Sequence, residues 1–586
     1  MLAVDDTATF VSNDKYIVLG RELAENNGLS FDTLTTDTGY CLKQIDHTFY
    51  FYGNTKYGTI NGVYGFLKTY FGLDVYYYDE YDIQTLESLS VCDLDVTVNP
   101  DIDYLFVGYG EMSTTTAGGP LTEEAVMYKF RMGFETSYYV SSGGIHNFTS
   151  IISEEKYGEA HPDWFVTVST AYQSATTLNL SYNDYEMADA LFEEIKERLI
   201  ADPDIKIYGF SAPDIDAWPE TDTSIALYKK YGTHSAEYIL FMNRVAEKLQ
   251  DWFKENAPER TLEFYLLAYN QTLTAPAKYN STTGRYEPID DEVKLYAGNN
   301  VKVTCYFAPS AANSYRPFTA EDEINGQYAK ELQKWAALTD TVYLWLYSLY
   351  ADNYLLPVDT ITAMQETYRF AVENNVKILF NQSQWDQDVS TDWARLKIYL
   401  QSNLAKDCNA DVNALIQKFM NDYFADASNA MLKLLSAERS WYSVLYERLA
   451  EVDSAENAQV GYLFSSGWLN WSALWDDDVV WSGTSTSGAD ESMLLTWYSY
   501  VEEAYAAIEK YKTSDPTLYT ELYERIQLEA IPVRYLLAWQ FDNTTYGTME
   551  DIYNDCVALG MTRFGESHSF ENKEEALGWM ESGSFL

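Results

Sequence analysis

Short apolar runs alternate with longer amphipathic stretches through the middle of the chain, from about residue 103 to residue 385. About eight of these runs have the length and the β-branched or aromatic content of buried strands: Tyr104–Tyr109, Tyr138–Val140, one within Phe165–Leu180, Ile205–Phe210, Leu262–Tyr269, Val301–Phe307, Val342–Tyr347 and Lys377–Phe380. Amphipathic helices separate the later runs, at Glu237–Asn256, Gly326–Leu338 and Pro357–Asn374. Because strands that alternate with helices build parallel sheets, the pattern predicts an α/β fold with a (β/α)8 TIM-type barrel.

The chain has a different pattern on either side of this stretch. Residues 7–95 are rich in β-formers, with strands predicted at Tyr16–Gly20 and Phe49–Tyr52, and a glycine-punctuated turn from Gly58 leads into a helix that ends at Gly72. After residue 391 helical periodicity dominates, at Trp393–Asn403, Asp411–Tyr423, Ala427–Leu449, Met493–Lys512 and Leu518–Phe541. The sequence therefore predicts a small N-terminal α/β domain over residues 1–100, the barrel over residues 101–400 and a C-terminal α-helical domain over residues 401–586.

The segment Lys206–Trp218 joins a predicted strand to two acids and a tryptophan. Asp214 and Asp216 follow the apolar run directly, and their spacing puts both side chains on one face if the backbone stays extended. Side chains at the end of a barrel strand project into the crevice where ligands bind. Two carboxylates beside an apolar ring suit acid–base chemistry on a sugar, so both are candidate catalytic residues. The structural alternative is that they cap the following helix.

Other predicted strand ends also carry amides, hydroxyls and aromatic rings but few cations. This set suits a neutral or amide-bearing carbohydrate better than a phosphate or a uronate. The candidate substrate-binding residues are His146, Asn147, His161, Trp218, Tyr269, Asn270, Trp345, Tyr347, Asn353, Tyr354, Asn381, Gln382, Gln384 and Trp385. Structural roles remain open for several of them, since His146 and His161 sit beside turn-forming residues and Trp345 lies within an apolar run.

Composition and charge narrow the classes of partner. The chain has 39 Lys+Arg against 89 Asp+Glu and a net charge of −50, which argues against a nucleic-acid surface and against adhesion to anionic membranes. Five scattered cysteines exclude a disulfide scaffold and a cysteine-based zinc site. No membrane-length apolar run, cofactor loop or metal-type cluster occurs, so we expect no membrane insertion, no cofactor and no metal. The start of the chain shows no export signal.

Two sets of motifs resemble known families. Gly62-Val-Tyr-Gly-Phe-Leu67 with Gly72-Leu-Asp-Val-Tyr76 resembles the small α/β domain that precedes many glycosidase barrels, including those of α-glucuronidases and family 20 hexosaminidases. An ordered set over roughly Tyr16 to Ala430 resembles domain of unknown function 4838, part of which forms glycoside hydrolase family 163: Gly143–Asn147, His161–Phe165, Phe210-Ser211 with Asp216, Phe241–Asn243, Ala268-Tyr269, Trp335, Trp345–Tyr347 with Pro357, Leu396–Tyr399, Asp407–Asp411 and Tyr423.

The resemblance implies an endo-acting β-N-acetylglucosaminidase on N-glycans, with an oligosaccharide or a glycoprotein glycan as partner and a secreted or cell-surface location. It implies a retaining mechanism in which the substrate's 2-acetamido oxygen attacks the anomeric carbon. One carboxylate orients the amide and a second carboxyl protonates the leaving oxygen, and Asp214 and Asp216 are the positions that match. Which aspartate takes which role stays open.

One departure from the family pattern lies beside these acids. Such proteins commonly carry a Cys-x-Cys-x-x-Cys cluster soon after the acid, whereas this chain has Ala217-Trp-Pro-Glu-Thr-Asp-Thr223. The loop that supports the site is therefore different, and a fold hosts many activities. Two alternatives follow: another glycosidase on the same scaffold, for example one directed at uronic acids, or a glycan-binding protein without catalysis. A uronate site should show a strand-end Arg or Lys, and the sequence offers no convincing one.

Overall fold

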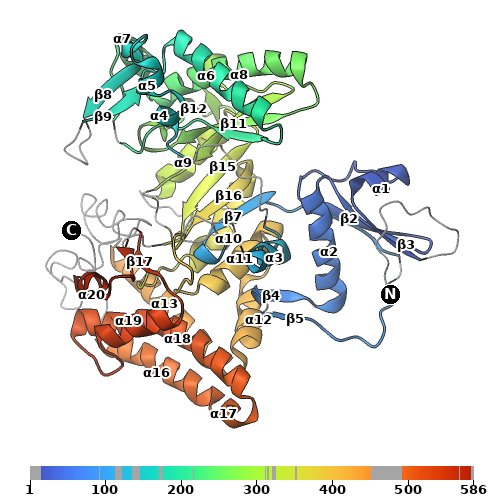
Figure 1. The fold of residues 1–586 in the computed structure, drawn as a ribbon, viewed down its shortest axis with the longest axis vertical. Coiled ribbons are helices and arrows are strands. Elements are labelled where there is room, and N and C mark those ends of the chain that lie inside the picture. The colour runs from blue at the N-terminus through green and yellow to red at the C-terminus, as the bar shows by residue number, and fades with distance from the viewer. Residues whose placement is uncertain are drawn as a thin grey trace.

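A parallel sheet of six strands forms the centre of the molecule (Figure 1). The structure is a computed structural model and describes residues 15–78, 80–91, 93–112, 122–134, 145–169, 176–215, 217–310, 312, 314, 316–319, 325–349, 353–449, 491–566 and 568–582. The sheet strands in spatial order are β10 (Ile207–Gly209), β11 (Leu262–Ala268), β14 (Val301–Phe307), β15 (Val342–Tyr347), β16 (Val376–Gln382) and β7 (Tyr104–Gly108). In β14 all residues but Lys302 are buried, as expected where both faces of a parallel sheet are covered.

In chain order, the last strand of the sheet pairs with the first: Ile378 of β16 lies opposite Tyr104 of β7. In a complete barrel the last and first strands also pair in this way. Within the described residues the sheet stays open between β7 and β10, so it is a curled half-barrel rather than the complete barrel that the sequence predicts. The predicted strand Tyr138–Val140 lies outside the described residues. The strand expected within Phe165–Leu180 is not part of this sheet: it is an antiparallel hairpin of β8 (Phe165–Ser169) and β9 (Thr176–Leu180).

Helices cover the sheet and connect its strands. They are α3 (Glu123–Met132), α4 (Phe148–Ile151), α5 (Glu154–Tyr157), α6 (Tyr185–Ala201), α7 (Asp222–Tyr231), α8 (Ser235–Asn256), α9 (Asn325–Ala336), α10 (Ile361–Glu373) and α11 (Ala394–Lys406), and a hairpin of β12 (Ala277–Asn280) and β13 (Arg285–Pro288) joins them. Helix α8 shows why these segments form helices that pack on the sheet: Tyr238, Met242, Val245 and Leu249 recur at helical spacing and are all buried.

The N-terminal unit is a second, smaller sheet with a helix packed on it. Its elements are β1 (Tyr16–Leu19), α1 (Arg21–Asn26), β2 (Tyr40–Ile45), β3 (Thr48–Gly53), α2 (Lys56–Phe71), β4 (Asp74–Tyr77), β5 (Glu80–Asp82) and β6 (Asp95–Val98), with sheet order β1-β3-β2-β6. The predicted turn at Gly58 is wrong, because Gly58 lies inside α2. A Cβ atom there would lie 2.3 Å from the carbonyl oxygen of Gly39, and one at Gly65 would lie 2.2 Å from the hydroxyl of Tyr40. These glycines let the helix approach the sheet closely.

The C-terminal unit is mainly helical and returns to the central sheet. It contains α12 (Val412–Phe424), α13 (Ser428–Leu449), α16 (Glu491–Ile508), α17 (Tyr511–Ser514), α18 (Pro516–Phe541), α19 (Met549–Ala558), α20 (Lys573–Ser582) and a hairpin of β17 (Arg563–Gly565) and β18 (His568–Ser569). The hairpin lies against the segments that follow β15 and β16: Tyr354 N donates to Phe564 O at 2.6 Å, and Arg563 Nε donates to Asp386 O at 2.7 Å. Across the described ranges, no helix has both the length and the apolar character needed to span a bilayer.

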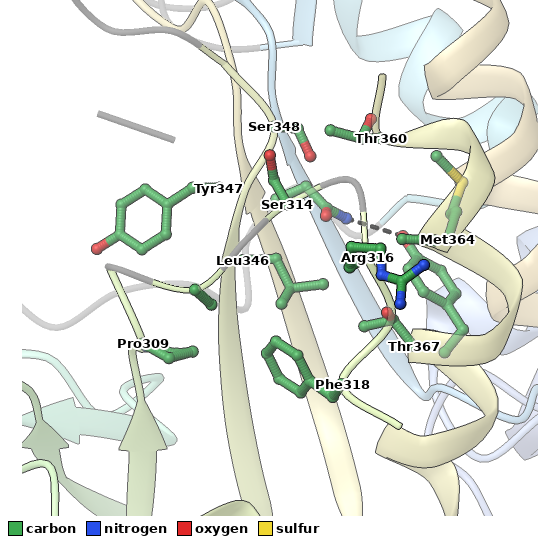
Figure 2. A pocket seen from close by; sticks show the side chains of 14 residues that line it. Pro309, Ser314, Arg316, Phe318, Leu346, Tyr347, Ser348, Thr360, Met364 and Thr367 are labelled. Atoms are coloured by element: carbon green, nitrogen blue, oxygen red, sulfur yellow. Dashed lines mark hydrogen bonds between the residues drawn. The ribbon is translucent and has the colours of Figure 1, made fainter. Parts of the chain in front are cut away.

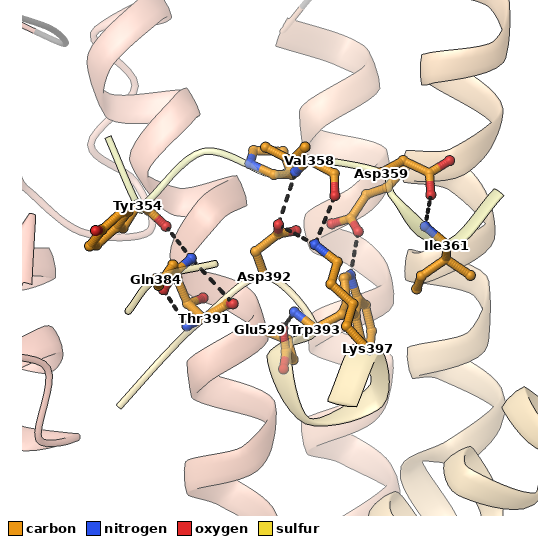
Figure 3. A network of polar contacts seen from close by, with 12 residues as sticks. Tyr354, Val358, Asp359, Ile361, Gln384, Thr391, Asp392, Trp393, Lys397 and Glu529 are labelled. Carbon is orange, nitrogen blue, oxygen red and sulfur yellow. Dashed lines mark hydrogen bonds and ion pairs between the residues drawn. The ribbon is translucent and has the colours of Figure 1, made fainter. Parts of the chain in front are cut away.

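Buried charged side chains join the helices to the loop after β16 (Figure 3). We call Asp392, Lys397, Glu438 and Glu529 the buried network. Asp392 accepts hydrogen bonds from Lys397 Nζ at 2.5 Å and from Val358 N at 3.0 Å. Glu529 accepts from Trp393 N at 2.7 Å, and Glu438 accepts from the indole of Trp393 at 2.6 Å. Burial raises the pKa of Asp392 to about 6 and that of Glu529 to about 7.

Candidate functional site

Asp214 follows the carboxyl end of β10 and lies near Tyr269, the residue that follows β11. Asp214 is exposed, and Tyr269 is half-buried. Burial raises the pKa of Tyr269, and the charge and hydrogen bond of Asp214 raise it further. The Tyr269 hydroxyl therefore stays protonated at neutral pH and remains a hydrogen-bond donor.

His146 lies beside the same tyrosine. The centres of the His146 and Tyr269 rings are 5.9 Å apart. The loop after β10 holds this histidine in place, because His146 N donates to Ser211 Oγ at 2.7 Å and Nδ1 lies 2.7 Å from Ala212 O. Its φ of 59° is an uncommon conformation for a residue other than glycine, and these two contacts fix it.

Strand β15 contributes two aromatic rings to the same edge. Trp345 and Tyr347 are two residues apart, so they project from one face of the strand, and their ring centres lie 5.9 Å apart at an interplanar angle of 22°. Burial raises the pKa of Tyr347, and the charges of Asp214 and Glu566 both add to that rise. Tyr347 therefore lies near two carboxyl groups from distant parts of the chain.

Glu566 reaches this edge from the turn between β17 and β18. Its Oε1 accepts hydrogen bonds from Gln382 Nε2 at 2.8 Å and from Trp385 Nε1 at 2.7 Å. Gln382 in turn accepts from Trp345 Nε1 at 3.1 Å, which links the acid to the ring pair on β15. Burial raises the pKa of Glu566, the charge of Asp386 adds to the rise, and the two hydrogen bonds oppose it.

We call these side chains the cleft group: Asp214, Tyr269, Trp345, Tyr347, Gln382, Trp385 and Glu566. All but Glu566 belong to the residues that the sequence indicates. Asp216, the second candidate catalytic residue, lies outside the described residues. Trp385 is 45% exposed, so its ring is available to a ligand. Aromatic faces, amides and carboxyl groups at the carboxyl edge of a parallel sheet can bind a sugar ring and exchange protons with it.

Two of the candidate binding residues have structural roles beneath the loop after β10. Trp218 is buried, stacks on Tyr182 with ring centres 4.7 Å apart, and donates its indole N–H to Glu237 at 3.0 Å. Asn147 is also buried and donates to the carbonyl of Gly209 at 2.8 Å. Both side chains therefore support the loop that carries Asp214.

Two further candidates lie at the margin of the site or away from it. His161 stacks on Trp164, with ring centres 3.9 Å apart and an interplanar angle of 12°, beside the β8–β9 hairpin. The structure does not bring it to the cleft group. Asn270 is exposed and donates to the carbonyl of Ile215 at 3.4 Å, so it borders the Asp214 loop.

Three candidates near β16 are buried and bonded to neighbouring segments. Asn353 donates to the hydroxyl of Tyr535 on α18 at 3.0 Å. Tyr354 donates to Asp386 at 2.5 Å. Gln384 is buried, donates to the carbonyl of Tyr354 at 3.2 Å and accepts from Thr391 N at 3.1 Å. Tyr354 and Gln384 therefore join the loops after β15 and β16, and Asn353 joins the first of these loops to the C-terminal unit.

A depression of about 40 Å³ adjoins the cleft group, between the ends of β15 and β16 and helix α10 (Figure 2). Tyr347 borders both features. Asn381 lines the depression and donates to the hydroxyl of Tyr368 at 2.8 Å. Arg316 lines it as well, so a cation does lie beside the strand ends. No three His, Cys, Asp or Glu side chains gather in a metal-binding arrangement within the described part of the chain.

Residues 93–435 match the family model described as domain of unknown function DUF4838, which is more than half of the chain. The protein belongs to the DUF4838 family. At the level of sequence, no curated protein matches it.

Solved structures with a similar fold are glycoside hydrolases. A family GH115 4-O-methyl-α-glucuronidase with specificity for decorated arabinogalactans is 12% identical, with a TM-score of 0.50 over 96% of this chain and 73% of that one. A GH138 enzyme that targets pectin rhamnogalacturonan II is 10% identical, with a TM-score of 0.39 over 98% and 93%. A family 89 glycoside hydrolase from Clostridium perfringens is 10% identical, with a TM-score of 0.41 over 88% and 59%. At such identities the likeness to the GH115 enzyme is one of fold.

The DUF4838 region does not contain the whole cleft group. It supplies Asp214, the two β15 rings, Gln382 and Trp385, whereas Glu566 lies more than 100 residues beyond its end. Nothing in the local sequence marks Glu566, because it sits between two very short strands and its partners lie far away along the chain. Only the folded structure brings it to the cleft.

Proposed function

We propose that this DUF4838 protein is a glycoside hydrolase and that the cleft group forms its active site. One observation carries the proposal: an exposed carboxylate, Asp214, lies beside half-buried aromatic rings and amides at the carboxyl edge of a parallel sheet. The Trp345–Tyr347 pair and Trp385 offer flat apolar faces to a sugar ring. Gln382 offers a hydrogen-bond donor to its polar groups.

The proposed substrate is a β-linked N-acetylhexosamine in a glycan, including N-glycans, cleaved with retention by participation of the 2-acetamido group. The resemblance of the strand-end motifs, among them Phe210-Ser211 with Asp216, to family 163 hydrolases supports this choice. Asp214 and Asp216 are the proposed carboxylates beside the acetamide. Tyr269 lies beside Asp214, whose charge helps to raise the pKa of the Tyr269 hydroxyl.

The test measures the release of glycan from an N-glycoprotein and of the aryl group from an aryl β-N-acetylglucosaminide. We expect Asp214→Asn and Asp216→Asn each to lower kcat by about 10²–10⁴-fold. Asp222→Asn is the matched control, because Asp222 is equally exposed in the first turn of α7. Full activity in a folded Asp214→Asn protein would refute the assignment. Glycan binding by the wild type without any hydrolysis would favour a binding protein instead.

Arg316 favours a second candidate, a glycosidase directed at uronic acids. A guanidinium group binds a sugar carboxylate in a bidentate manner, and Arg316 lines the depression that Tyr347 borders. On this alternative the wild type hydrolyses aryl uronides faster than aryl N-acetylhexosaminides. Arg316→Gln would then raise KM for the uronide by about tenfold or more and leave neutral substrates unaffected.

A further inference from the structure

The hydrogen bonds of Glu566 give its two carboxyl oxygens different roles. Both donors, Gln382 Nε2 and Trp385 Nε1, bond to Oε1. Among the described residues, none forms a hydrogen bond with Oε2. An oxygen that accepts two N–H groups has its lone pairs engaged, so a proton on this carboxyl resides on the other oxygen. Oε2 is therefore the atom that can give up or take a proton.

The surroundings of Glu566 favour the protonated form of its carboxyl. The side chain is half-buried under the loop after β16, and burial together with the charge of Asp386 holds its pKa above the usual range. The same two N–H groups stabilise the carboxylate once the proton has left. A carboxyl whose pKa is raised in this way is better able to act as a general acid.

Glu566 also lies at the same edge of the sheet as Asp214. The charge of each acid raises the pKa of Tyr347, so both lie near this tyrosine. Trp385, which donates to Glu566, exposes its ring at the mouth of the site. A sugar ring held against these aromatic faces would therefore lie near both acids.

We propose that Glu566, delivered by the β17–β18 hairpin of the C-terminal unit, is the proton donor to the leaving group in this active site. The inference rests on the proposed function. As the 2-acetamido oxygen bonds to the anomeric carbon, the bond from that carbon to the glycosidic oxygen breaks; its electron pair goes to the glycosidic oxygen, which takes the proton from Oε2. Water then attacks the anomeric carbon, the bond to the acetamido oxygen breaks with its electron pair returning to the acetamide, and the water gives a proton to the Glu566 carboxylate, so the carboxyl is regenerated. Asp214 and Asp216 are left to orient the acetamide.

Substrates whose leaving groups differ in acidity distinguish proton donation by Glu566 from the role of the aspartates. A dinitrophenyl glycoside needs little protonation as it leaves, whereas a glycan alcohol needs it fully. We expect Glu566→Gln to lower kcat on the glycan by about 10²–10⁴-fold and to slow the dinitrophenyl substrate by less than about tenfold. Asp216→Asn should slow both substrates alike. The glutamine side chain still offers an oxygen to Gln382 and Trp385, so the variant is expected to fold.

Two further measurements complete the test. The alkaline limb of the kcat/KM profile should disappear in Glu566→Gln, and it should persist in Glu571→Gln, a control at an exposed acid of the same unit. An unchanged alkaline limb, or equal slowing of both substrates in Glu566→Gln, would overturn the assignment of Glu566. In that case the wild type would still cleave glycans and the proposed function would stand. A wild type that cleaves no glycoside would overturn both.

Discussion

The loop after β16 contributes side chains to two polar regions, the cleft group and the buried network. The carboxyl groups of the two regions accept hydrogen bonds from different kinds of donor. In the cleft group, side chains provide the donors: Gln382 and Trp385 bond to Glu566. In the buried network, main-chain N–H groups and Lys397 provide most of them, as for Asp392. Side-chain donors can rearrange when a ligand arrives, whereas main-chain donors and a buried ammonium cannot. The kind of hydrogen-bond donor therefore distinguishes a carboxyl group that can react with a substrate from one that stabilises the fold.

Removing the buried ammonium should have the largest effect on stability. Lys397 and Asp392 are 1% and 6% exposed, so Lys397→Met leaves a carboxylate buried without its cation. We expect the free energy of unfolding to fall by about 3–5 kcal/mol, measured by urea denaturation. Lys302→Met is the control, because its pair with Asp340 is 38% and 71% exposed and should contribute less than about 1 kcal/mol. Equal effects at the two sites would contradict the comparison.

The buried network should also make stability depend on pH. Burial raises the folded-state pKa of Glu529 to about 7 from 4.5, so the folded protein binds more protons than the unfolded chain between these values. Stability therefore falls as pH rises from about 4.5 to 7, by up to about 3 kcal/mol for this group. Urea denaturation at pH 5 and pH 7.5 measures the difference.

The matched variant for this prediction is Glu529→Gln, whose amide oxygen can still accept from Trp393 N. It has no proton to lose, so its stability should vary less between the two pH values. Parallel curves for the variant and the wild type would show that Glu529 does not titrate in the folded protein.

Two neighbouring glutamines provide the sharpest contrast between the regions. Gln384→Ala removes bonds to the main chain of Tyr354 and Thr391, and should destabilise the protein by about 1–3 kcal/mol while leaving kcat unchanged. Gln382→Ala should change stability by less than about 0.5 kcal/mol and lower activity by about tenfold, because Glu566 and Trp345 lose their shared partner. Thermal unfolding and glycan-release kinetics on both variants check this. A reversal of the two outcomes would break the comparison.

Trp385 should give the smallest effect. Trp385→Ala removes an exposed aromatic face, and we expect KM to rise about fivefold, equivalent to about 1 kcal/mol. Trp385→Phe keeps a ring but removes the N–H that bonds to Glu566. KM should then stay within about twofold of the wild type. The alkaline limb of the rate profile should move to higher pH, because that bond lowers the pKa of Glu566. A shift to lower pH would be inconsistent with this bond.

Local periodicity predicts most of the central sheet. Strands β14 and β15 have the bounds that the sequence predicts, because each is a short run rich in β-branched and aromatic residues and at least half-buried throughout. The Phe165–Leu180 stretch was ambiguous, since a Val- and Thr-rich segment with a polar middle fits one strand or a hairpin equally well. The glycines of α2 are turn-formers by propensity, and only the close approach of Gly58 to Gly39 explains their place in a helix.

The candidate site was only partly accessible from the sequence. Strand ends indicate Asp214, Tyr269 and Tyr347, because parallel strands present their carboxyl ends at one edge. The same rule selects Gln384 and Trp218 as readily, yet both are buried and structural. Whether a polar side chain near a strand end faces a ligand or the core depends on which distant segment covers it. For the loop after β16 that segment is the β17–β18 hairpin.

The pairing of β16 with β7 has a consequence for the order of folding. Tyr104 meets Ile378 across about 270 residues of chain, and β16 is the neighbour of β7 among the described strands. During synthesis, β7 therefore emerges long before its partner and has an unpaired edge until β16 has been made. Contacts of such long range slow folding and leave edges open to wrong partners in the meantime. The synthesis of β16 therefore sets the earliest time at which the growing chain can complete the central sheet.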